Sequence, residues 1–264
     1  MKTLVLSSAA TNFPFILGRL HAIRDELHEI EHIVGTSAGG IIGTLIAAGF
    51  EPLELFEWIE DRKLVKETVL RCNPFNLLFT TYLIDNEWIV TLLSTLLQEK
   101  GLSKECTLAE FAKEKKVRLT LPVFNISQGL PEMFDSDTHP NLKVVDALLA
   151  TSAIPFIFPP VRCNDQWYCD GALTHSFPSN VIDSDPETTL GIAICNTPLG
   201  IDKNILSWKW IPQTIACAAN FVQREFHPPA FKTMYIRHSH LPFSHYDGPA
   251  MFKEGLDADG EWLK

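Results

Sequence analysis

The sequence contains no run of about 18 or more apolar residues, and no internal repeat or low-complexity stretch. Because a transmembrane helix needs such a run, we expect no membrane-spanning segment. The N-terminal apolar run, residues 4–6, is short and is interrupted by Ser7 and Ser8, which is unlike a signal peptide. We therefore expect a soluble, intracellular (cytoplasmic) protein that meets membranes only peripherally.

Basic residues are also scarce, with 22 Lys and Arg against 32 Asp and Glu, and the formal net charge is −10. Nucleic-acid binding requires a basic footprint, so we expect no nucleic-acid partner. Long-range attraction to anionic membranes also depends on Lys and Arg clusters. The composition therefore leaves room for a local basic patch at most.

None of the six cysteines forms a CxxC pair, which argues against a zinc ribbon or a thioredoxin-like redox site. Most of them lie beside apolar residues, as free and partly buried thiols do, and this indicates a reducing compartment. The even number leaves disulfides open. The cysteines are Cys72, Cys106, Cys163, Cys169, Cys195 and Cys217.

The N-terminal pattern is typical of a parallel α/β fold. A short apolar strand at 4–6 is followed by helical spacing over 16–29 and a second strand at 30–34. A glycine-rich turn then leads into an apolar helix at 41–48. No linker-like stretch divides the chain, so we predict a single α/β domain over residues 1–264.

Periodicity predicts the remaining elements, and Gly49 and Thr107 are expected to cap helices. The predicted helices are 52–61, 86–98, 108–115 and 144–150, and the predicted strands are 119–126, 166–169, 189–195 and 234–236.

The segment Gly35-Thr36-Ser37-Ala38-Gly39 has the GxSxG spacing of a nucleophile elbow, a sharp turn between a strand and a helix. Small residues must flank the serine because backbone segments approach closely there. The turn exposes the serine hydroxyl and aims the first amides of the helix at nearby negative charge. The position between an apolar strand and an apolar helix favours Ser37 as a nucleophile over an incidental serine in a tight turn.

A serine nucleophile needs a base, and the sequence offers two kinds. Asp170 follows an apolar strand and precedes Gly171, although an Asp-Gly pair by itself is typical of a β-turn. A Ser-Asp-His triad order also stays open, because several histidines follow Asp170. For any one of them a surface or loop position is the more common role. They are His175, His227, His238, His240 and His245.

Three blocks in the right order, covering nearly the whole chain, resemble the patatin-like phospholipase family. They are the elbow at 35–40, residues 150–161, and Asp170-Gly171-Ala172 followed by Phe177-Pro178. The resemblance implies a three-layer α/β/α sandwich with a mainly parallel sheet and no metal or cofactor. It also implies cleavage of lipid carboxylic esters, as by a phospholipase A or a lysophospholipase.

The resemblance further implies a Ser–Asp dyad without a catalytic histidine, in which Ser37 forms the acyl-enzyme and Asp170 is the base. The carboxylate must then accept the serine proton directly, so its pKa must be well above the usual value near 4. Burial raises the pKa of a carboxyl group. Tyr168, Cys169 and Phe177 beside Asp170 are consistent with an apolar setting.

The chain departs from the family at the loop after the first strand, which is usually glycine-rich and supplies the oxyanion-hole amides. In the corresponding residues 7–13, glycines are replaced by Ser8, Ala9 and Ala10. We expect the hole to be formed by the backbone N–H groups of Ala9 and Ala10, together with that of Ala38 at the elbow. The loss of one such donor typically lowers turnover about 100- to 1,000-fold.

Two outcomes follow from this departure. Ala and Ser resist a positive φ by about 1–2 kcal/mol, so the loop either keeps its donors in an ordinary conformation or has a degraded hole. The second outcome would make the protein a weak or inactive lipid-binding member of the family. Asn12 stands where the family usually has a basic residue, and Phe13 stands where it has a further glycine. Ala172 stands where the family often has another glycine, and alanine is a common variant there. The small residues at 7–10 favour the first outcome.

Two aromatic-rich clusters could contact lipid, but ordinary packing under a loop is the favoured interpretation for most of their residues. Transfer of the acyl group to an acceptor other than water also stays open. The first cluster is Phe75, Leu77, Leu78, Phe79 and Tyr82, and the second is Phe226, Pro228, Pro229 and Phe231.

Overall fold

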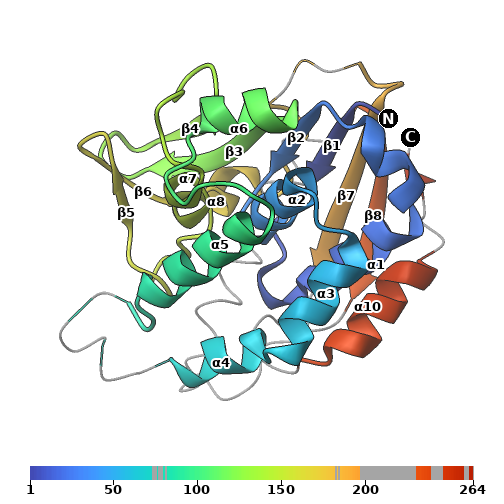
Figure 1. The fold of residues 1–264 in the computed structure, drawn as a ribbon, viewed down its shortest axis with the longest axis horizontal. Helices are drawn as coiled ribbons and strands as arrows, with labels where there is room; N and C mark the ends of the chain where they lie inside the picture. The colour runs from blue at the N-terminus through green and yellow to red at the C-terminus, as the bar shows by residue number, and fades with distance from the viewer. Residues whose placement is uncertain are drawn as a thin grey trace.

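The structure is a computed structural model, and it describes residues 1–72, 76, 80, 82–181, 183, 185–196, 230–238, 246–258 and 262–263. In these residues a nine-stranded sheet forms the centre of the molecule, with helices packed against it (Figure 1). The strand order is β5-β6-β3-β2-β1-β7-β8-β9, and β4 pairs with β3.

The middle of the sheet is parallel, since β3, β2, β1, β7 and β8 pair side by side in the same direction. The outer pairs are antiparallel. The strands are β1 (Thr3–Leu6), β2 (His32–Gly35), β3 (Arg118–Asn125), β4 (Leu130–Asp135), β5 (Val161–Cys163), β6 (Gln166–Asp170), β7 (Thr189–Asn196), β8 (Lys232–His238) and β9 (Trp262–Leu263).

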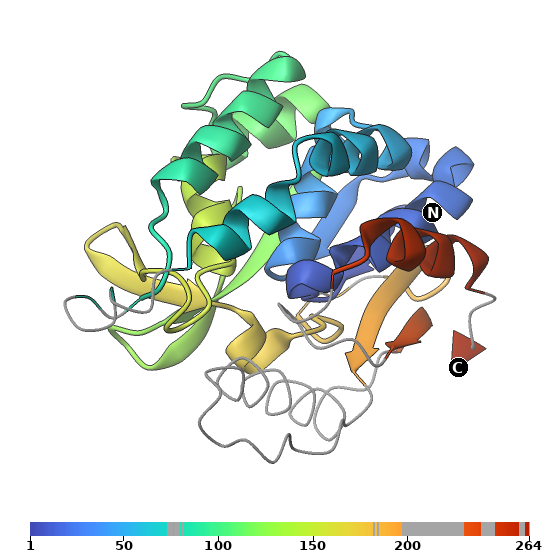
Figure 2. The ribbon, with the colours of Figure 1, turned by 90° about the horizontal axis from the view of Figure 1, so that it is seen from below.

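Most of the described helices lie on one side of the sheet, as α1, α2, α3 and α10 do in front of the parallel strands in Figure 1. Figure 2, turned by 90°, shows α3 and α10 on the same side of β7 and β8. The α-helices are α1 (Phe13–Ala22), α2 (Ala38–Ala48), α3 (Pro52–Asp61), α4 (Leu64–Leu70), α5 (Glu87–Glu99), α6 (Leu108–Lys115), α7 (Val144–Thr151), α8 (Ala172–His175) and α10 (Gly248–Asp257). Two 3-10 turns are η1 (Ala10–Asn12) and η2 (Arg24–Glu29).

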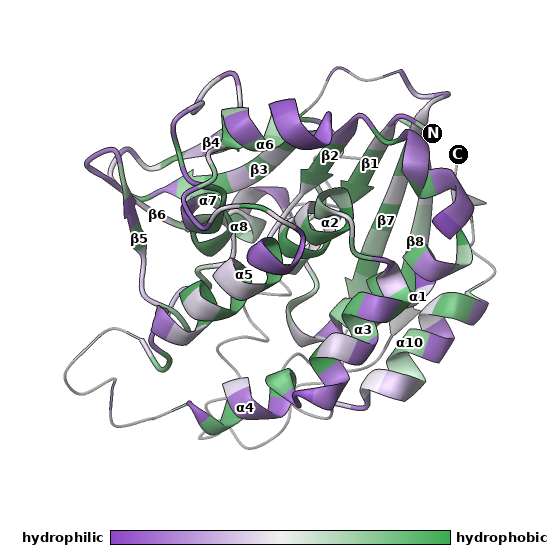
Figure 3. Cartoon of the chain, viewed as in Figure 1, coloured by the Kyte–Doolittle hydropathy of each residue, from purple (hydrophilic) through white to green (hydrophobic). Residues whose placement is uncertain are grey.

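The sheet is buried on both faces, as expected for parallel strands. In β1, Leu4 and Leu6 pack into the large core under the helices, whereas Val5 packs on the other face with Val34 and Phe177. Hydrophobic residues accordingly run along the strands, and polar residues gather on the outer sides of the helices (Figure 3). This arrangement confirms the predicted α/β sandwich with a mainly parallel sheet.

Most predicted elements are present, often with boundaries shifted by a residue or two. The helices predicted at 52–61 and 108–115 match α3 and α6, and Thr107 and Glu110 form the expected capping box. Gly49 ends α2 with a left-handed φ of 114°.

The predicted boundaries of the helix at 16–29 were wrong at both ends. The α-helix begins at Phe13, with Pro14 in its first turn, and ends at Ala22. The polar residues that follow form the 3-10 turn η2, which buries none of its side chains. Only Leu27 of this segment packs against the core, and it is only partly buried, so the segment has little of the packing that stabilises an α-helix. The sequence also did not predict β4, β5, β9, α4, α8 or α10.

Five cysteines, Cys72, Cys106, Cys163, Cys169 and Cys195, are free thiols, and three of them are buried. Cys217 lies outside the described residues. In the first lipid-contact cluster only Tyr82 is described, and in the second only Phe231, which is buried against the sheet in agreement with the packing interpretation.

In the part of the chain that the structure describes, no single helix has the length and apolarity needed to cross a membrane. The pair α2 and α3 passes that test together, but the two helices are bent by 117° at their junction.

Candidate active site

Ser37 lies in the sharp turn between β2 and α2, at the carboxyl end of the parallel strands. Its backbone is strained, with φ 55° and ψ −125°, and it directly precedes the first turn of α2. The turn passes close to the end of β1, because a Cβ on Gly39 would lie 2.3 Å from the carbonyl oxygen of Ser7. Glycine at this position is therefore required by space, and the GxSxG spacing forms the predicted elbow.

Asp170 is the last residue of β6, which pairs antiparallel with β3. Its backbone N–H donates to the carbonyl oxygen of Ala153 at 3.0 Å. The chain then turns tightly against β3, since a Cβ on Gly171 would lie 2.1 Å from the carbonyl oxygen of Pro122. The two blocks 150–155 and 170–172, which are separate in sequence, thus meet beside the elbow.

The Ser37 hydroxyl donates a hydrogen bond to the Asp170 carboxylate, with 2.8 Å between Oγ and Oδ2. The other carboxylate oxygen accepts the Ala172 N–H at 2.8 Å. Both side chains are buried, with 4% of Ser37 and 3% of Asp170 exposed. Burial raises the pKa of Asp170 to about 7, although the hydrogen bonds from Ala172 and Ser37 act to lower it. Such a carboxylate can accept a proton near neutral pH.

Two threonines that the sequence did not single out hold the elbow in place. Thr151 Oγ1 accepts the Ser37 N–H at 3.2 Å and donates to the carbonyl oxygen of Pro122 at 2.6 Å. Thr36 Oγ1 donates to the carbonyl oxygen of His175 at 2.7 Å. Thr151 lies within one of the family-like blocks, so its position was visible, but its contact with Ser37 depends on the fold.

None of the histidines that the structure describes forms a hydrogen bond with the Ser37 hydroxyl. The His175 ring is buried and lies 3.0 Å from Thr174 Oγ1 through Nδ1, and no hydrogen bond joins it to Ser37 or Asp170. The other candidates, His227, His240 and His245, and the His238 side chain lie outside the described residues.

The unusual loop after β1 is anchored from both sides. Ser7 Oγ accepts the Ile194 N–H at 2.8 Å. The Ser8 N–H donates to the Ser176 carbonyl oxygen at 2.7 Å, and the two serine hydroxyls are also 2.7 Å apart. The Ser8 amide is therefore occupied and is unavailable to a ligand.

The next residues leave their amides unoccupied. In the described part of the chain, the N–H groups of Ala9, Ala10 and Ala38 have no acceptor. Ala10 has a φ of 47°, so the expectation of an ordinary conformation throughout the loop was wrong at this residue. The loop thus keeps the backbone shape that glycine favours, with strain at Ala10. Ala10 and Ala38 line the same cavity as Ser37, whereas Ala9 does not.

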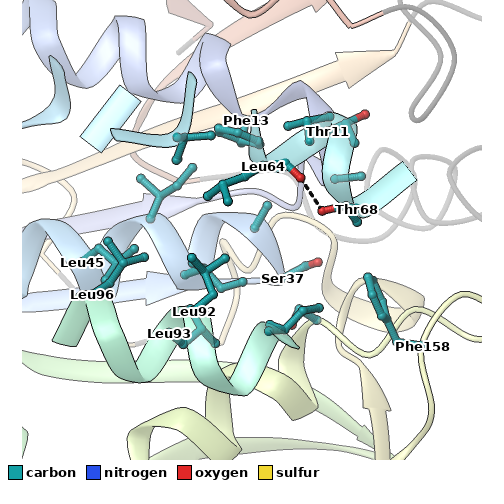
Figure 4. Close-up of a pocket in the computed structure, with 18 of the residues that line it drawn as sticks. Thr11, Phe13, Ser37, Leu45, Leu64, Thr68, Leu92, Leu93, Leu96 and Phe158 are labelled. Atoms are coloured by element: carbon teal, nitrogen blue, oxygen red, sulfur yellow. Dashed lines mark hydrogen bonds between the residues drawn. The ribbon is translucent and has the colours of Figure 1, made fainter. Parts of the chain in front are cut away.

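A cavity of about 190 Å³ opens next to Ser37 between α2, α3, α4 and α5 (Figure 4). Its walls are mostly apolar, and no charged side chain of the described residues lines it. The lining residues are Ala10, Thr11, Phe13, Ser37, Ala38, Ile41, Ile42, Leu45, Leu55, Ile59, Leu64, Val65, Thr68, Trp88, Ile89, Leu92, Leu93, Leu96, Ser152, Ile154 and Phe158.

The patatin-like phospholipase family model matches residues 4–181. A probable lipid hydrolase, 463L of Invertebrate iridescent virus 6, is 30% identical over 186 residues, which cover 68% of this chain and 62% of that protein. A cGAMP-activated phospholipase of Escherichia coli (strain TW11681) is 30% identical over 166 residues, which cover 56% of this chain and 42% of that protein. The chain therefore spans less than two thirds of these relatives.

Solved structures show the same fold at low sequence identity. VipD from Legionella pneumophila has a TM-score of 0.62 at 14% identity, with 97% of this chain and 65% of VipD covered. ExoU in its complex with SpcU from Pseudomonas aeruginosa has a TM-score of 0.54 at 15% identity, with 97% of this chain and 50% of that chain covered.

Proposed function

The chain belongs to the patatin-like phospholipase family, and from this premise we propose that it hydrolyses carboxylic esters of lipids with Ser37 as nucleophile and Asp170 as base. The observation that carries the proposal is the buried hydrogen bond from Ser37 Oγ to Asp170 Oδ2 at the end of an apolar cavity. The cavity accepts an acyl chain, and the dyad acts on the ester carbonyl at its end.

In the first half of the reaction, the Ser37 oxygen attacks the ester carbonyl carbon while its proton passes to Asp170 Oδ2. The tetrahedral intermediate collapses as the bond to the leaving alcohol breaks, and Asp170 returns the proton to that alcohol. In the second half, Asp170 takes a proton from water as the water oxygen attacks the acyl-enzyme. The fatty acid leaves, and the Ser37 oxygen regains its proton.

The negative charge of the intermediate needs hydrogen-bond donors at the carbonyl oxygen. We assign this role to the amides of Ala10 and Ala38, which line the cavity beside Ser37 and have no acceptor among the described residues. Ala9 has an equally unoccupied amide and is the third candidate. Ala38 also begins α2, and the partial positive charge at a helix N-terminus favours an oxyanion there.

The proposed substrates are phospholipids and lysophospholipids, as for a phospholipase A or a lysophospholipase. The support is the family and the cavity, whose described lining carries no charged side chain and favours an apolar chain over a polar one.

Labelling with a fluorophosphonate and hydrolysis of lipid esters test the proposal together. We expect wild-type Ser37 to be labelled, and Ser37→Ala to lose both labelling and hydrolysis. His175→Asn is the matched control, because this buried residue lies close to the elbow without a hydrogen bond to the dyad, and it should keep activity.

Each alternative has its own result in this experiment. Binding of lipid without labelling would indicate an inactive member of the family. Activity that tolerates Asp170→Asn but is lost on replacing one late histidine would indicate a Ser-His-Asp esterase. Formation of a new ester when an alcohol or a lysolipid is added would indicate acyl transfer.

A further inference from the structure

The cavity beside Ser37 extends away from the nucleophile along two helices, α2 and α5. In Figure 4, Leu45 and Leu96 lie together at one end, Leu92 and Leu93 lie between, and Ser37 lies towards the other end. On α2 the lining residues repeat with helical spacing at 38, 41, 42 and 45, and on α5 at 88, 89, 92, 93 and 96. One face of each helix therefore forms a wall that leads away from the nucleophile.

The length of the cavity follows from helix geometry. Ser37 immediately precedes α2, and Leu45 is the last residue of that helix on the lining. The distance between them along the axis is about 12 Å at a rise of about 1.5 Å per residue. The lining on α5 runs from Trp88 to Leu96 and has the same length.

The far end of the cavity is closed by packed core. Phe50 follows α2, is 3% exposed, and donates its N–H to the Leu45 carbonyl oxygen at 3.1 Å. The Lys100 ammonium covers the Phe50 ring, 4.1 Å from its centre. Leu97, next to Leu96, is 1% exposed in the same core, and neither Phe50 nor Leu97 lines the cavity. Leu45 and Leu96 therefore form its floor.

Two estimates of capacity agree. A C–C bond of about 1.5 Å gives an extended hydrocarbon chain a rise of about 1.3 Å per carbon, so about 12 Å holds about nine carbons. An apolar cavity of about 150 Å³ is known to hold the six carbons of a benzene ring, so the cavity of about 190 Å³ holds about eight.

We propose that this cavity measures the acyl chain, that it prefers chains of about eight to nine carbons, and that Leu45 and Leu96 set the limit. The inference rests on the proposed function, because the acyl carbon must be attached to Ser37 for the cavity to measure the rest of the chain. A longer chain must leave its excess carbons in water or push the floor apart, and a packed core resists such displacement.

The direct test is the hydrolysis of monomeric p-nitrophenyl esters with acyl chains of about four to about sixteen carbons. Each carbon that enters the cavity should raise kcat/KM about fourfold, the effect of burying one CH₂ group. The rise should stop near nine carbons, and kcat/KM should then stay level or fall. A rise that continues unbroken to the longest ester would overturn the proposal.

Two substitutions of one floor residue should move the limit in opposite directions. Leu45→Ala removes about three carbons from the floor and should move the limit about two to three carbons longer. Leu45→Phe fills existing space and should move it about two carbons shorter without leaving a void. Leu20→Ala in α1 removes the same volume from a fully buried site outside the cavity, so its limit should match wild type.

The outcomes separate this inference from the proposed function. An unchanged limit in Leu45→Phe, with fluorophosphonate labelling and hydrolysis of the shortest ester intact, would refute the measuring role and leave the hydrolase standing. Hydrolysis that persists in Ser37→Ala would refute the proposed function itself. Thermal unfolding of each variant shows whether it is folded. If Leu45→Ala does not fold, Leu45→Phe still decides the test, because it leaves no void in the core.

Discussion

The two ends of the central strands hold two aspartates that are both shielded from solvent but whose pKa values shift in opposite directions. Asp170, at the carboxyl end, is 3% exposed, and Asp135, beside the amino ends of β2 and β3, is 4% exposed. Burial raises the pKa of Asp170 to about 7. For Asp135, burial acts in the same direction, but backbone hydrogen bonds and the Arg118 guanidinium outweigh it and lower the pKa.

The difference lies in how deeply each carboxylate is enclosed and in its partners. Asp135 is 2.9 Å from the Arg118 guanidinium and accepts N–H groups from Asp137 and Thr138 at 2.9 Å. Asp170 accepts only from Ser37 and Ala172, and no cationic side chain of the described residues is among the causes of its shift. Burial without a cation makes a carboxylate basic, whereas burial with one makes it a structural anion.

The largest expected effect contrasts the two aspartates as catalysts. Asp170→Asn should lower kcat/KM for a lipid ester at least about 1,000-fold, because the amide cannot accept the Ser37 proton. Asp135 lies at the other end of the strands, so Asp135→Asn should leave kcat/KM within about threefold of the wild-type value. Steady-state kinetics on a soluble ester checks both variants, and a comparable loss in Asp135→Asn would remove the distinction.

The substitutions Asp170→Asn and Asp135→Asn should also change the free energy of unfolding in opposite directions. The folded protein binds the Asp170 proton more tightly than the unfolded chain, so between about pH 4 and pH 7 stability falls as the pH rises. Asp170→Asn removes this cost and should raise the free energy of unfolding at pH 8 by a few kcal/mol, with little gain at pH 4.

Asp135→Asn should instead destabilise the fold at neutral pH by about 1–3 kcal/mol, because it weakens the interaction with Arg118. Since the pKa of Asp135 is lowered, this penalty should disappear as the pH falls through the acidic range. Urea unfolding at several pH values measures both variants. Equal curves for wild type and Asp170→Asn at pH 8 would contradict the assignment of a basic carboxylate whose burial lowers stability.

His32 sharpens the comparison at the amino end. Its Nε2 is 2.9 Å from Thr120 Oγ1, and burial, together with the nearby Arg118 charge, lowers its pKa to about 4. The unfolded chain then binds the proton more tightly, so stability should decline as the pH falls from about 6.5 to about 4, by about 1–2 kcal/mol for this partly buried ring. His32→Gln should flatten that decline, and unfolding curves identical to wild type would argue against it.

The smallest expected effect concerns the strained loop at the carboxyl end. Ala10→Gly should stabilise the protein by about 1 kcal/mol, because glycine adopts the positive φ of Ala10 without the steric cost. The N–H is retained, so kcat should stay within about threefold of wild type. Thermal unfolding and kinetics measure the two quantities, and a loss of stability would show that Ala10 is not strained.

Local patterns predicted the parts of the fold whose causes are local. The elbow, the α3 boundaries and the Thr107 cap follow from residues within one turn of each other. α10 was not predicted, although Asp247 caps its start and Pro249 lies in its first turn, because Gly255 and its neighbours give little apolar periodicity on their own. The helix packs closely on α1, where a Cβ on Gly255 would lie 2.1 Å from the Phe15 carbonyl oxygen. That contact exists only in the folded chain.

The features of the candidate site also fall into those that local sequence predicts and those that depend on packing. Ser37 and Asp170 were predicted from short motifs, and the resemblance to a family paired them. The strain at Ala10, the support from Thr151 and the floor at Leu45 were not predicted, since each depends on what packs against it.

The sequence by itself determined the turn that carries Ser37, because five neighbouring residues specify the steric requirements of the elbow. The tertiary structure decided which base Ser37 has and which cavity lies beside it. It brings Asp170 to 2.8 Å from a residue 133 positions away, buries that carboxylate with no cationic partner among the described residues, and closes the cavity at Leu45 and Leu96. The physical reason is that a pKa and a cavity depth depend on the surroundings of a group, and distant segments form those surroundings only when the chain folds.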